Sequence, residues 1–345
     1  MPGDLLIRAP NHLGDLVMAL PALEAAGGDV LVARWLVPVL ELSPAFAPGA
    51  EPARRILPLD RGARGLAEAV RAVRSGGYRR GILLTPSFSS ALIFALAGVR
   101  ERRGTPTDGR GFLLTEVVPP SELAGLHRSE RYLRIVTGER PSTRPVPRLV
   151  VPEAAAVRWR ALMGPRGEGR LVGIFPGSNA PSRRWEPDRF AAVARAMAGQ
   201  GARVVVFGGG GERELAAQVA GDVALNVAGR TDLPTLAAGL ADCDLLITND
   251  SGPMHLAAAV GTPTISLWGA GDRAETGPLG SGHRVLVRAD LPCVPCVRNH
   301  CPRRGRGYLL EDAERECLRL IEAKDVLAAV DAGGGDRRGI AIVEG

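Results

Sequence analysis

The sequence has few aromatic residues and no long apolar run. Aromatic side chains make up 4% of its 345 residues, and no apolar stretch approaches the roughly 20 residues of a membrane-spanning helix. The first apolar segment, residues 5–7, is too short for a secretory signal and follows Asp4 directly. We therefore expect a soluble, cytoplasmic protein.

Lysine is almost absent. Lys324 is the only lysine among 43 basic residues, and the net charge is +6. Arginine binds phosphate and carboxylate through a planar fork, so the bias is compatible with an anionic partner, but a genome-wide preference for arginine explains it equally well. The arginines are scattered and are not interleaved with aromatic residues, so no nucleic-acid partner is expected.

Short apolar runs alternate with helical patterns along the chain, as in parallel α/β proteins. In the first half we expect strands at residues 4–9, 29–34 and 81–85, helices at 15–26, 64–74, 90–97 and 129–136, and an exposed loop at 105–122. In the second half we expect strands at 171–175, 203–207, 223–227, 245–248, 264–268 and 285–287, and helices at 153–163, 187–198, 212–220, 233–240 and 254–260.

The length favours two domains, because one core usually stops growing below this size. Residues 139–152 carry four prolines, and the glycines of residues 164–169 suit a hinge. We place the domains at residues 1–165 and 166–345, with the last helix a candidate to pack back on the first domain. Two doubly wound domains facing across a cleft would bind ligands beyond the carboxyl ends of their strands.

Residues 248–268 contain the most informative polar cluster. Asp250, Ser251 and Gly252 follow a buried strand and precede a helix, and His255 lies one turn into that helix. Exposed N–H groups and a positive dipole at a helix start suit a phosphate. The alternative is that Asp250 and Ser251 only cap the helix.

Two further loops in this half have polar residues after a strand. Ser178, Asn179 and Arg183 follow the strand at 171–175 and are donors of the kind that a diphosphate needs; a plain surface loop is the alternative. Glu212 follows the glycine run at 208–211, where it could accept hydrogen bonds from an adenine or ribose, although a bare glycine run is a weak signal.

Asp15 is the candidate base of the first half. It lies near the start of a helix that follows the first strand, and Gly14 before it allows close backbone approach. An aspartate there is either a helix cap or a general base that removes a proton from an acceptor hydroxyl.

Four cysteines cluster near the end of the chain. Their spacing is C-x2-C-x4-C-x15-C, and His300 lies among them; the cysteines are Cys293, Cys296, Cys301 and Cys317. Such a cluster in a cytosolic chain is compatible with zinc, with free thiols or with a local disulfide, and the spacing fits no standard zinc module.

Taken together, these segments resemble the ADP-heptose:lipopolysaccharide heptosyltransferases, most closely the heptosyltransferase II branch. The resemblance covers nearly the whole chain in the same order: NHLGD at 11–15, PGSN at 176–179, RRW at 183–185, NVAG at 226–229, NDSGPMH at 249–255 and CVPC at 293–296.

The resemblance implies a GT-B fold, with the acceptor on the first domain near Asn11, His12 and Gly14 and the sugar nucleotide on the second. It implies Asp15 as the base of an inverting transfer. On the donor side it implies that Asp250 contacts the heptose and that the diphosphate is held by Ser178, Asn179, Arg183, Ser251, Gly252 and His255. Relatives often carry lysine at the position of Arg183. Arginine keeps the charge of lysine but binds a phosphate with a different geometry.

The implied reaction moves heptose from ADP-L-glycero-D-manno-heptose to the inner-core heptose of lipopolysaccharide. No aspartate-rich metal-binding motif is present, so we expect departure of ADP without a metal and no required cofactor. The acceptor would be lipid-anchored, which implies peripheral contact with the cytoplasmic face of the inner membrane. Alternatives are a related transferase acting on another core sugar or on a protein, a GT-B sugar-nucleotide epimerase, or a module that only binds the ADP-sugar.

Overall fold

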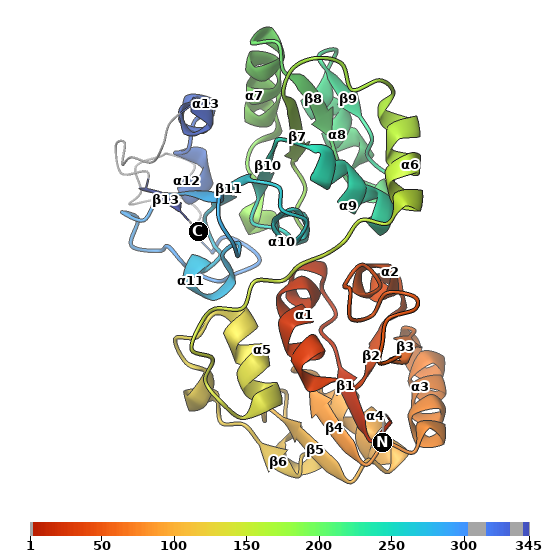
Figure 1. The fold of residues 1–345 in the computed structure, drawn as a ribbon. Helices are drawn as coiled ribbons and strands as arrows, with labels where there is room; N and C mark the ends of the chain where they lie inside the picture. The colour runs from red at the N-terminus through yellow and green to blue at the C-terminus, as the bar shows by residue number, and fades with distance from the viewer. Residues whose placement is uncertain (1–2, 303–314, 332–340, 345) are drawn as a thin grey trace. The chain divides into compact units, whose positions relative to one another are not determined.

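The computed structural model describes residues 3–302, 315–331 and 341–344. The chain divides into two compact units, Met1–Val150 and Val151–Gly345. Each unit has a mainly parallel sheet with helices packed against it (Figure 1). The α/β class predicted from the alternation of strands and helices is confirmed.

The first unit has a six-stranded parallel sheet in the order β3-β2-β1-β4-β5-β6. The strands are β1 (Leu5–Arg8), β2 (Asp29–Ala33), β3 (Ile56–Leu59), β4 (Arg80–Leu83), β5 (Glu101–Gly104) and β6 (Glu116–Val117). The helices are α1 (Leu13–Ala26), α2 (Val37–Leu40), α3 (Gly62–Gly76), α4 (Phe88–Ala97) and α5 (Arg128–Thr137). The chain order reverses between β1 and β4, where doubly wound sheets bind their ligands.

The second unit repeats this order with one added strand. Its sheet runs β13-β12-β11-β10-β7-β8-β9, and only β13 is antiparallel to its neighbour. The strands are β7 (Leu171–Phe175), β8 (Arg203–Val206), β9 (Ala224–Asn226), β10 (Leu245–Asn249), β11 (Thr264–Trp268), β12 (Arg284–Val287) and β13 (Ala341–Glu344). The helices are α6 (Glu153–Met163), α7 (Pro187–Gly199), α8 (Arg213–Ala220), α9 (Leu233–Asp242), α10 (Gly252–Ala259), α11 (Arg273–Thr276), α12 (Glu316–Arg319) and α13 (Ala323–Asp331). The order reverses between β7 and β10.

Four strands were not predicted, and one predicted loop is partly wrong. β3 is Ile-Leu-Pro-Leu, a short run interrupted by a proline. β5 is Glu-Arg-Arg-Gly and has no apolar run, while β6 is a two-residue edge strand inside the segment predicted as loop. β13 pairs with β12 from a distant part of the sequence. Strands of this kind form through pairing with a neighbour rather than through their own composition.

The domain boundary lies earlier than predicted, because α6 belongs to the second unit. Trp159 of α6 donates from Nε1 to the Asp242 carboxylate at 2.9 Å and stacks on Phe207 at 5.6 Å between ring centroids. At the other end of the unit, α13 buries Val326 and Ala329 in the same core as α7. The last helix of the described residues therefore packs on the core of the second unit, and its packing on the first unit stays a prediction.

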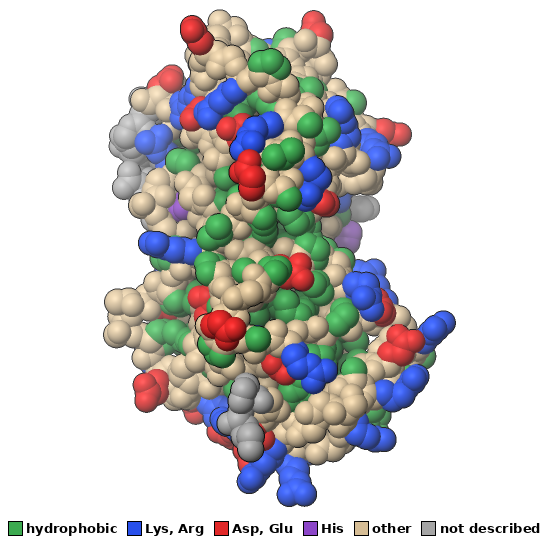
Figure 2. All heavy atoms as spheres, turned by 45° about the vertical axis from the view of Figure 1, so that its right-hand side comes forward, with side chains coloured by type: hydrophobic (Ala, Val, Ile, Leu, Met, Phe, Trp, Pro, Cys, Tyr) green, Lys and Arg blue, Asp and Glu red, His purple; other side chains and the backbone are tan. Residues whose placement is uncertain are grey.

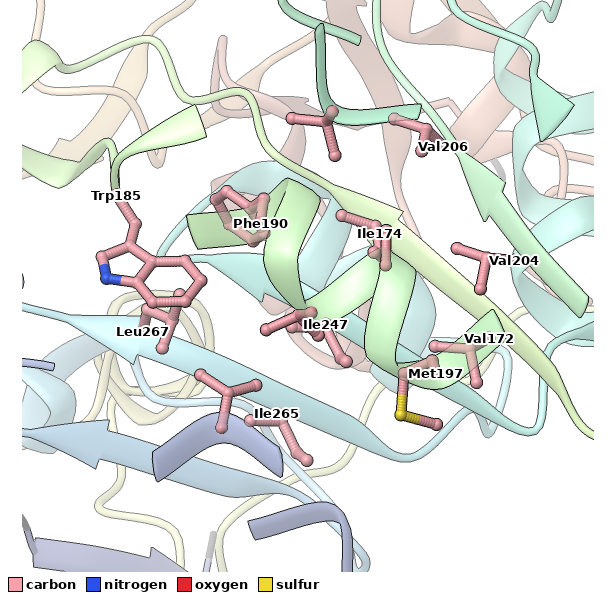
Figure 3. Close-up of a cluster of buried hydrophobic side chains, with 14 of the residues drawn as sticks. Val172, Ile174, Trp185, Phe190, Met197, Val204, Val206, Ile247, Ile265 and Leu267 are labelled. Atoms are coloured by element: carbon pink, nitrogen blue, oxygen red, sulfur yellow. The ribbon is translucent and has the colours of Figure 1, made fainter. Parts of the chain in front are cut away.

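The core of the second unit holds the central strands in place. Figure 3 shows side chains of β7, β8, β10 and β11 around Phe190 and Met197 of α7. Trp185 meets Phe190 edge-on at 4.8 Å and donates from Nε1 to the Ile321 carbonyl at 2.9 Å. Because the apolar residues of these strands are buried, the loops at their carboxyl ends have a rigid base.

Candidate active site

The polar residues predicted for the donor meet at the carboxyl ends of β7, β8 and β10. The loop after β7 carries Ser178 and Arg183, and the loop after β10 carries Asp250. These two loops flank the reversal of strand order in the second sheet, which is the expected ligand position in a doubly wound fold.

Asp250 and Arg183 form an ion pair. Arg183 Nη1 lies 3.0 Å from Asp250 Oδ2, and the Asp250 side chain is 3% exposed. Gly271 lies against this carboxylate, because a Cβ atom there would come within 2.0 Å of Oδ2. The predicted neighbours are thus brought together, and the Asp250 carboxylate pairs with an arginine instead of serving only as a cap.

The start of α10 lacks a side-chain cap. Ser251 occupies the N-cap position, but its side chain makes no capping hydrogen bond, and its Oγ lies 3.3 Å from Thr248 Oγ1. Gly252 is the first residue of the helix and is half-buried, and His255 is buried within it. The interpretation of Ser251 as a simple cap is therefore wrong.

Ser178 joins the two loops. Its Oγ donates to the Asp250 carbonyl at 3.3 Å, and its own carbonyl accepts from Arg184 Nε at 2.7 Å. Asn179 beside it is exposed. The main chain of the neighbouring loop therefore holds the Ser178 hydroxyl in place, and the exposed amide of Asn179 follows it. Both polar groups lie at the end of β7.

Glu212 reaches the same place from the loop after β8. Its Oε2 accepts from the Gly209 N–H at 2.7 Å, and its Oε1 would be 1.8 Å from a Cβ atom at Gly177. The carboxylate therefore packs directly on the glycine that precedes Ser178. Residues predicted separately from three loops form one cluster within the second unit.

Asn249 is a central residue of this cluster to which the sequence reasoning gave no role. Its Nδ2 donates to the Pro176 carbonyl at 2.7 Å, and its Oδ1 accepts from the Trp185 N–H at 3.0 Å. It is completely buried at the end of β10. Two features of the sequence could have drawn attention to Asn249. It lies directly before Asp250, and an amide side chain can bond to two main-chain segments at once.

In the first unit, Asp15 lies in the first turn of α1 and is contacted from α5. Its Oδ1 accepts from Tyr132 Oη at 3.2 Å and lies 3.4 Å from Arg128 Nη1. Burial, with a smaller contribution from the charge of Asp15, raises the pKa of Tyr132 well above its ordinary value, so the phenol remains a donor. The N-cap of α1 is His12, so Asp15 is not the cap.

The residues around Asp15 form the loop between β1 and α1. Asn11 and His12 are exposed, and Gly14 is buried. Arg8 lies beneath the loop, where Nη1 donates to the Ala9 carbonyl at 2.5 Å and Nη2 donates to the Asn11 side chain. Burial lowers the pKa of Arg8 to about 10. The sequence pattern predicts burial for apolar residues only, so it did not predict that Arg8 is buried and supports this loop.

The four cysteines line one pocket. Cys293, Cys296, Cys301 and Cys317 border it together with Ser182, Gly269 and Ala270. Burial, then the neighbouring thiols, raises the pKa of Cys317 to about 12. Within the part of the chain that the structure describes, no group of three or more His, Cys, Asp or Glu side chains could hold a metal ion. Zinc at these cysteines stays a prediction that elemental analysis of the purified protein can check.

No helix among the described residues is long and apolar enough to cross a membrane. The second unit carries a cluster of polar and charged side chains at its strand ends. The first unit, taken by itself, carries a carboxylate with two neighbouring donor side chains.

Comparison with known proteins identifies the family. The family model for glycosyltransferase family 9 (heptosyltransferase) matches residues 66–305. Lipopolysaccharide heptosyltransferase 2 of Escherichia coli is 27% identical over 308 residues, which cover 82% of this chain and 87% of that protein.

Solved structures show the same fold. The E. coli ADP-heptose lps heptosyltransferase II matches with a TM-score of 0.76 and 24% identity, covering 96% of this chain and 98% of that chain. The glycosyl transferase family 9 protein of Veillonella parvula matches with a TM-score of 0.77 and 22% identity, covering 96% and 97%. The expected GT-B fold with two Rossmann-like domains is confirmed. The chain belongs to glycosyltransferase family 9, the heptosyltransferases.

Proposed function

We propose that this enzyme transfers heptose from ADP-L-glycero-D-manno-heptose to the inner-core heptose of lipopolysaccharide, with inversion at the anomeric carbon. The observation that carries the proposal is the cluster of Arg183, Ser178, Glu212 and Asp250 at the strand ends of the second unit. A cation, ordered hydroxyl and amide groups and two carboxylates suit a nucleoside diphosphate sugar, which carries both phosphates and hydroxyls.

On the donor side, Arg183 and the start of α10 at Ser251 and Gly252 would hold the diphosphate, with Asn179, Ser178 and His255 completing its contacts. Glu212 would accept hydrogen bonds from the ribose or adenine, and Asp250 would contact the heptose. Negative charge that grows on the leaving ADP would be met by the Arg183 guanidinium and by the helix start.

On the acceptor side, Asp15 would take the proton of the attacking hydroxyl. The oxygen then bonds to the anomeric carbon while the bond from that carbon to the ADP oxygen breaks, through a transition state with oxocarbenium character. The donors Tyr132 and Arg128 fix the Asp15 side chain in one orientation. Because the carboxylate is already oriented, less of the reaction barrier comes from aligning it with the acceptor hydroxyl.

A lipid-anchored acceptor implies a cytoplasmic enzyme that touches the inner membrane at its surface. Phe112 is 77% exposed in the first unit, and its ring lies 6.1 Å from that of Phe88. Exposed aromatic side chains partition into the interfacial region of a bilayer. Figure 2 shows Lys and Arg side chains interspersed with Asp and Glu over the face in view, so the aromatic pair is the sharper target for substitution. Phe112→Ser should reduce sedimentation of the enzyme with anionic lipid vesicles.

The decisive experiment incubates the enzyme with ADP-heptose and a truncated inner-core acceptor, followed by mass spectrometry. A product heavier by one heptose supports the proposal. Release of nucleotide without any acceptor would instead indicate an epimerase, and donor binding without product would indicate a sensor. Replacing the acceptor by other core sugars or by a protein hydroxyl separates this enzyme from a related transferase.

A further inference from the structure

The guanidinium of Arg183 is paired with a carboxylate through Nη1, whereas its Nε lacks a hydrogen-bond partner among the described residues. Nη1 lies 3.0 Å from Asp250 Oδ2. Nε is buried and has no hydrogen-bond partner among the described residues. A guanidinium has five N–H donors in a fixed plane, so one arginine can hold a carboxylate on one side and a phosphate on another at the same time.

The Asp250 carboxylate is itself held in a tight place. It is 3% exposed, and Gly271 lies so close that a Cβ atom there would clash with Oδ2 at 2.0 Å. The backbone of Gly271 lies outside the left-handed region, so the glycine is required for space rather than for its backbone angles. The carboxylate is therefore confined between Gly271 and the Arg183 guanidinium.

The backbone around Arg183 is also fixed. Arg183 ends the short 3-10 helix Pro181–Arg183, and Ser182 donates from its N–H to the Asn299 carbonyl at 3.1 Å. The side chain of Arg183 is 27% exposed, so the guanidinium remains within reach of a ligand. With the backbone anchored, the ion pair with Asp250 decides where the guanidinium points.

We propose that Asp250 is a positioning residue for the diphosphate: it holds the Arg183 guanidinium so that the accessible part of the guanidinium faces the phosphates. This inference rests on the proposed function, because it assigns the ligand of Arg183 to the ADP-sugar. It goes beyond a contact between Asp250 and heptose, since it predicts that Asp250 affects nucleotides that carry no sugar.

The physical reason is pre-organisation. A free arginine side chain samples many rotamers, and ordering it on binding weakens affinity. Asp250→Asn removes the charge and leaves the side-chain shape, so the guanidinium loses its fixed direction. We expect ADP binding to weaken about tenfold, which corresponds to roughly 1.4 kcal/mol. AMP lacks the second phosphate and should be affected much less.

The experiment is titration calorimetry of ADP and AMP with the wild-type chain and with Asp250→Asn, Arg183→Lys and the double variant. We expect both single variants to lose most of the preference for ADP over AMP. The double variant should bind ADP no more weakly than Arg183→Lys alone, because residues that act as one unit are not additive. Gly271→Ala, which displaces the same carboxylate, should reproduce the loss.

The matched control is Asp290→Asn. It removes the same charge from another arginine–aspartate pair of the second unit, Arg288–Asp290 at 2.6 Å, and should leave ADP binding unchanged. Thermal unfolding of each variant checks that the unit is folded.

Two results would overturn the inference. One is an Asp250→Asn variant that binds ADP as the wild type does and loses affinity only for ADP-heptose. The other is an Asp250→Asn variant that binds ADP more tightly, which would mean that the carboxylate mainly repels the phosphates. A wild-type chain that does not bind ADP would instead refute the proposed function, so the two failures are distinguishable.

Discussion

Asn249→Ala should destabilise the second unit strongly, although it removes only a small amide. The substitution leaves the Trp185 N–H and the Pro176 carbonyl without their partner, and both residues are buried. A buried polar group that loses its hydrogen bond costs about 1–3 kcal/mol, so the two together cost roughly 2–6 kcal/mol of unfolding free energy. This exceeds the typical effect of a point substitution, which is about 1 kcal/mol.

Urea unfolding followed by tryptophan fluorescence measures this loss, because Trp185 itself is one of the affected residues. The matched control is Asn226→Ala at the end of β9. Asn226 accepts one hydrogen bond, from the Ala228 N–H at 2.9 Å, and is half-buried, so water can replace it. The control should lose about 1 kcal/mol or less.

Asn249→Ala should also weaken ADP binding, because the Asn249 side chain connects the loop after β7 to the end of β10. An Asn249→Ala variant that unfolds at the same urea concentration as the Asn226→Ala control would refute this reasoning. It would show that neither main-chain group depends on the amide.

The remaining predictions concern catalysis, packing and pH. Asp15→Asn should lower kcat by about a hundredfold or more while the donor KM stays nearly constant, as general-base loss does; unchanged initial rates would remove Asp15 from the mechanism. Gly177→Ala should weaken ADP binding in calorimetry, because its Cβ would lie 1.8 Å from Glu212 Oε1, whereas Gly210→Ala meets no atom within 4 Å and should bind normally; equal affinities would argue against contact of Glu212 with the nucleotide. Burial lowers the pKa of His283, so its neutral form stabilises the fold above the unfolded pKa of about 6.5 and this contribution is lost as the pH falls. The Tm of the wild type should therefore drop more between pH 7.5 and 5.5 than that of His283→Gln, and parallel curves would contradict the assignment.

Much of the fold followed from periodicity alone. The buried strands β7, β10 and β11 are short apolar runs between helical patterns, so they could be placed within a residue or two of their ends. The short strands β5 and β6 could not, because β5 has no apolar run, β6 has only two residues, and each is defined by pairing with a neighbouring strand. The boundary was misplaced for a similar reason: Trp159 assigns α6 to the second unit through contacts with distant residues.

The class of the fold, the strand ends that carry polar residues and the resemblance to a glycosyltransferase family could be predicted from residues alone, because these depend on local composition and spacing. Which of those residues meet depends on the folded chain. The ion pair between Arg183 and Asp250, the contact of Glu212 with Gly177 and the contact of Tyr132 with Asp15 each join separate segments. Such contacts are set by the order of strands in a sheet and by helix packing, and local sequence does not specify either.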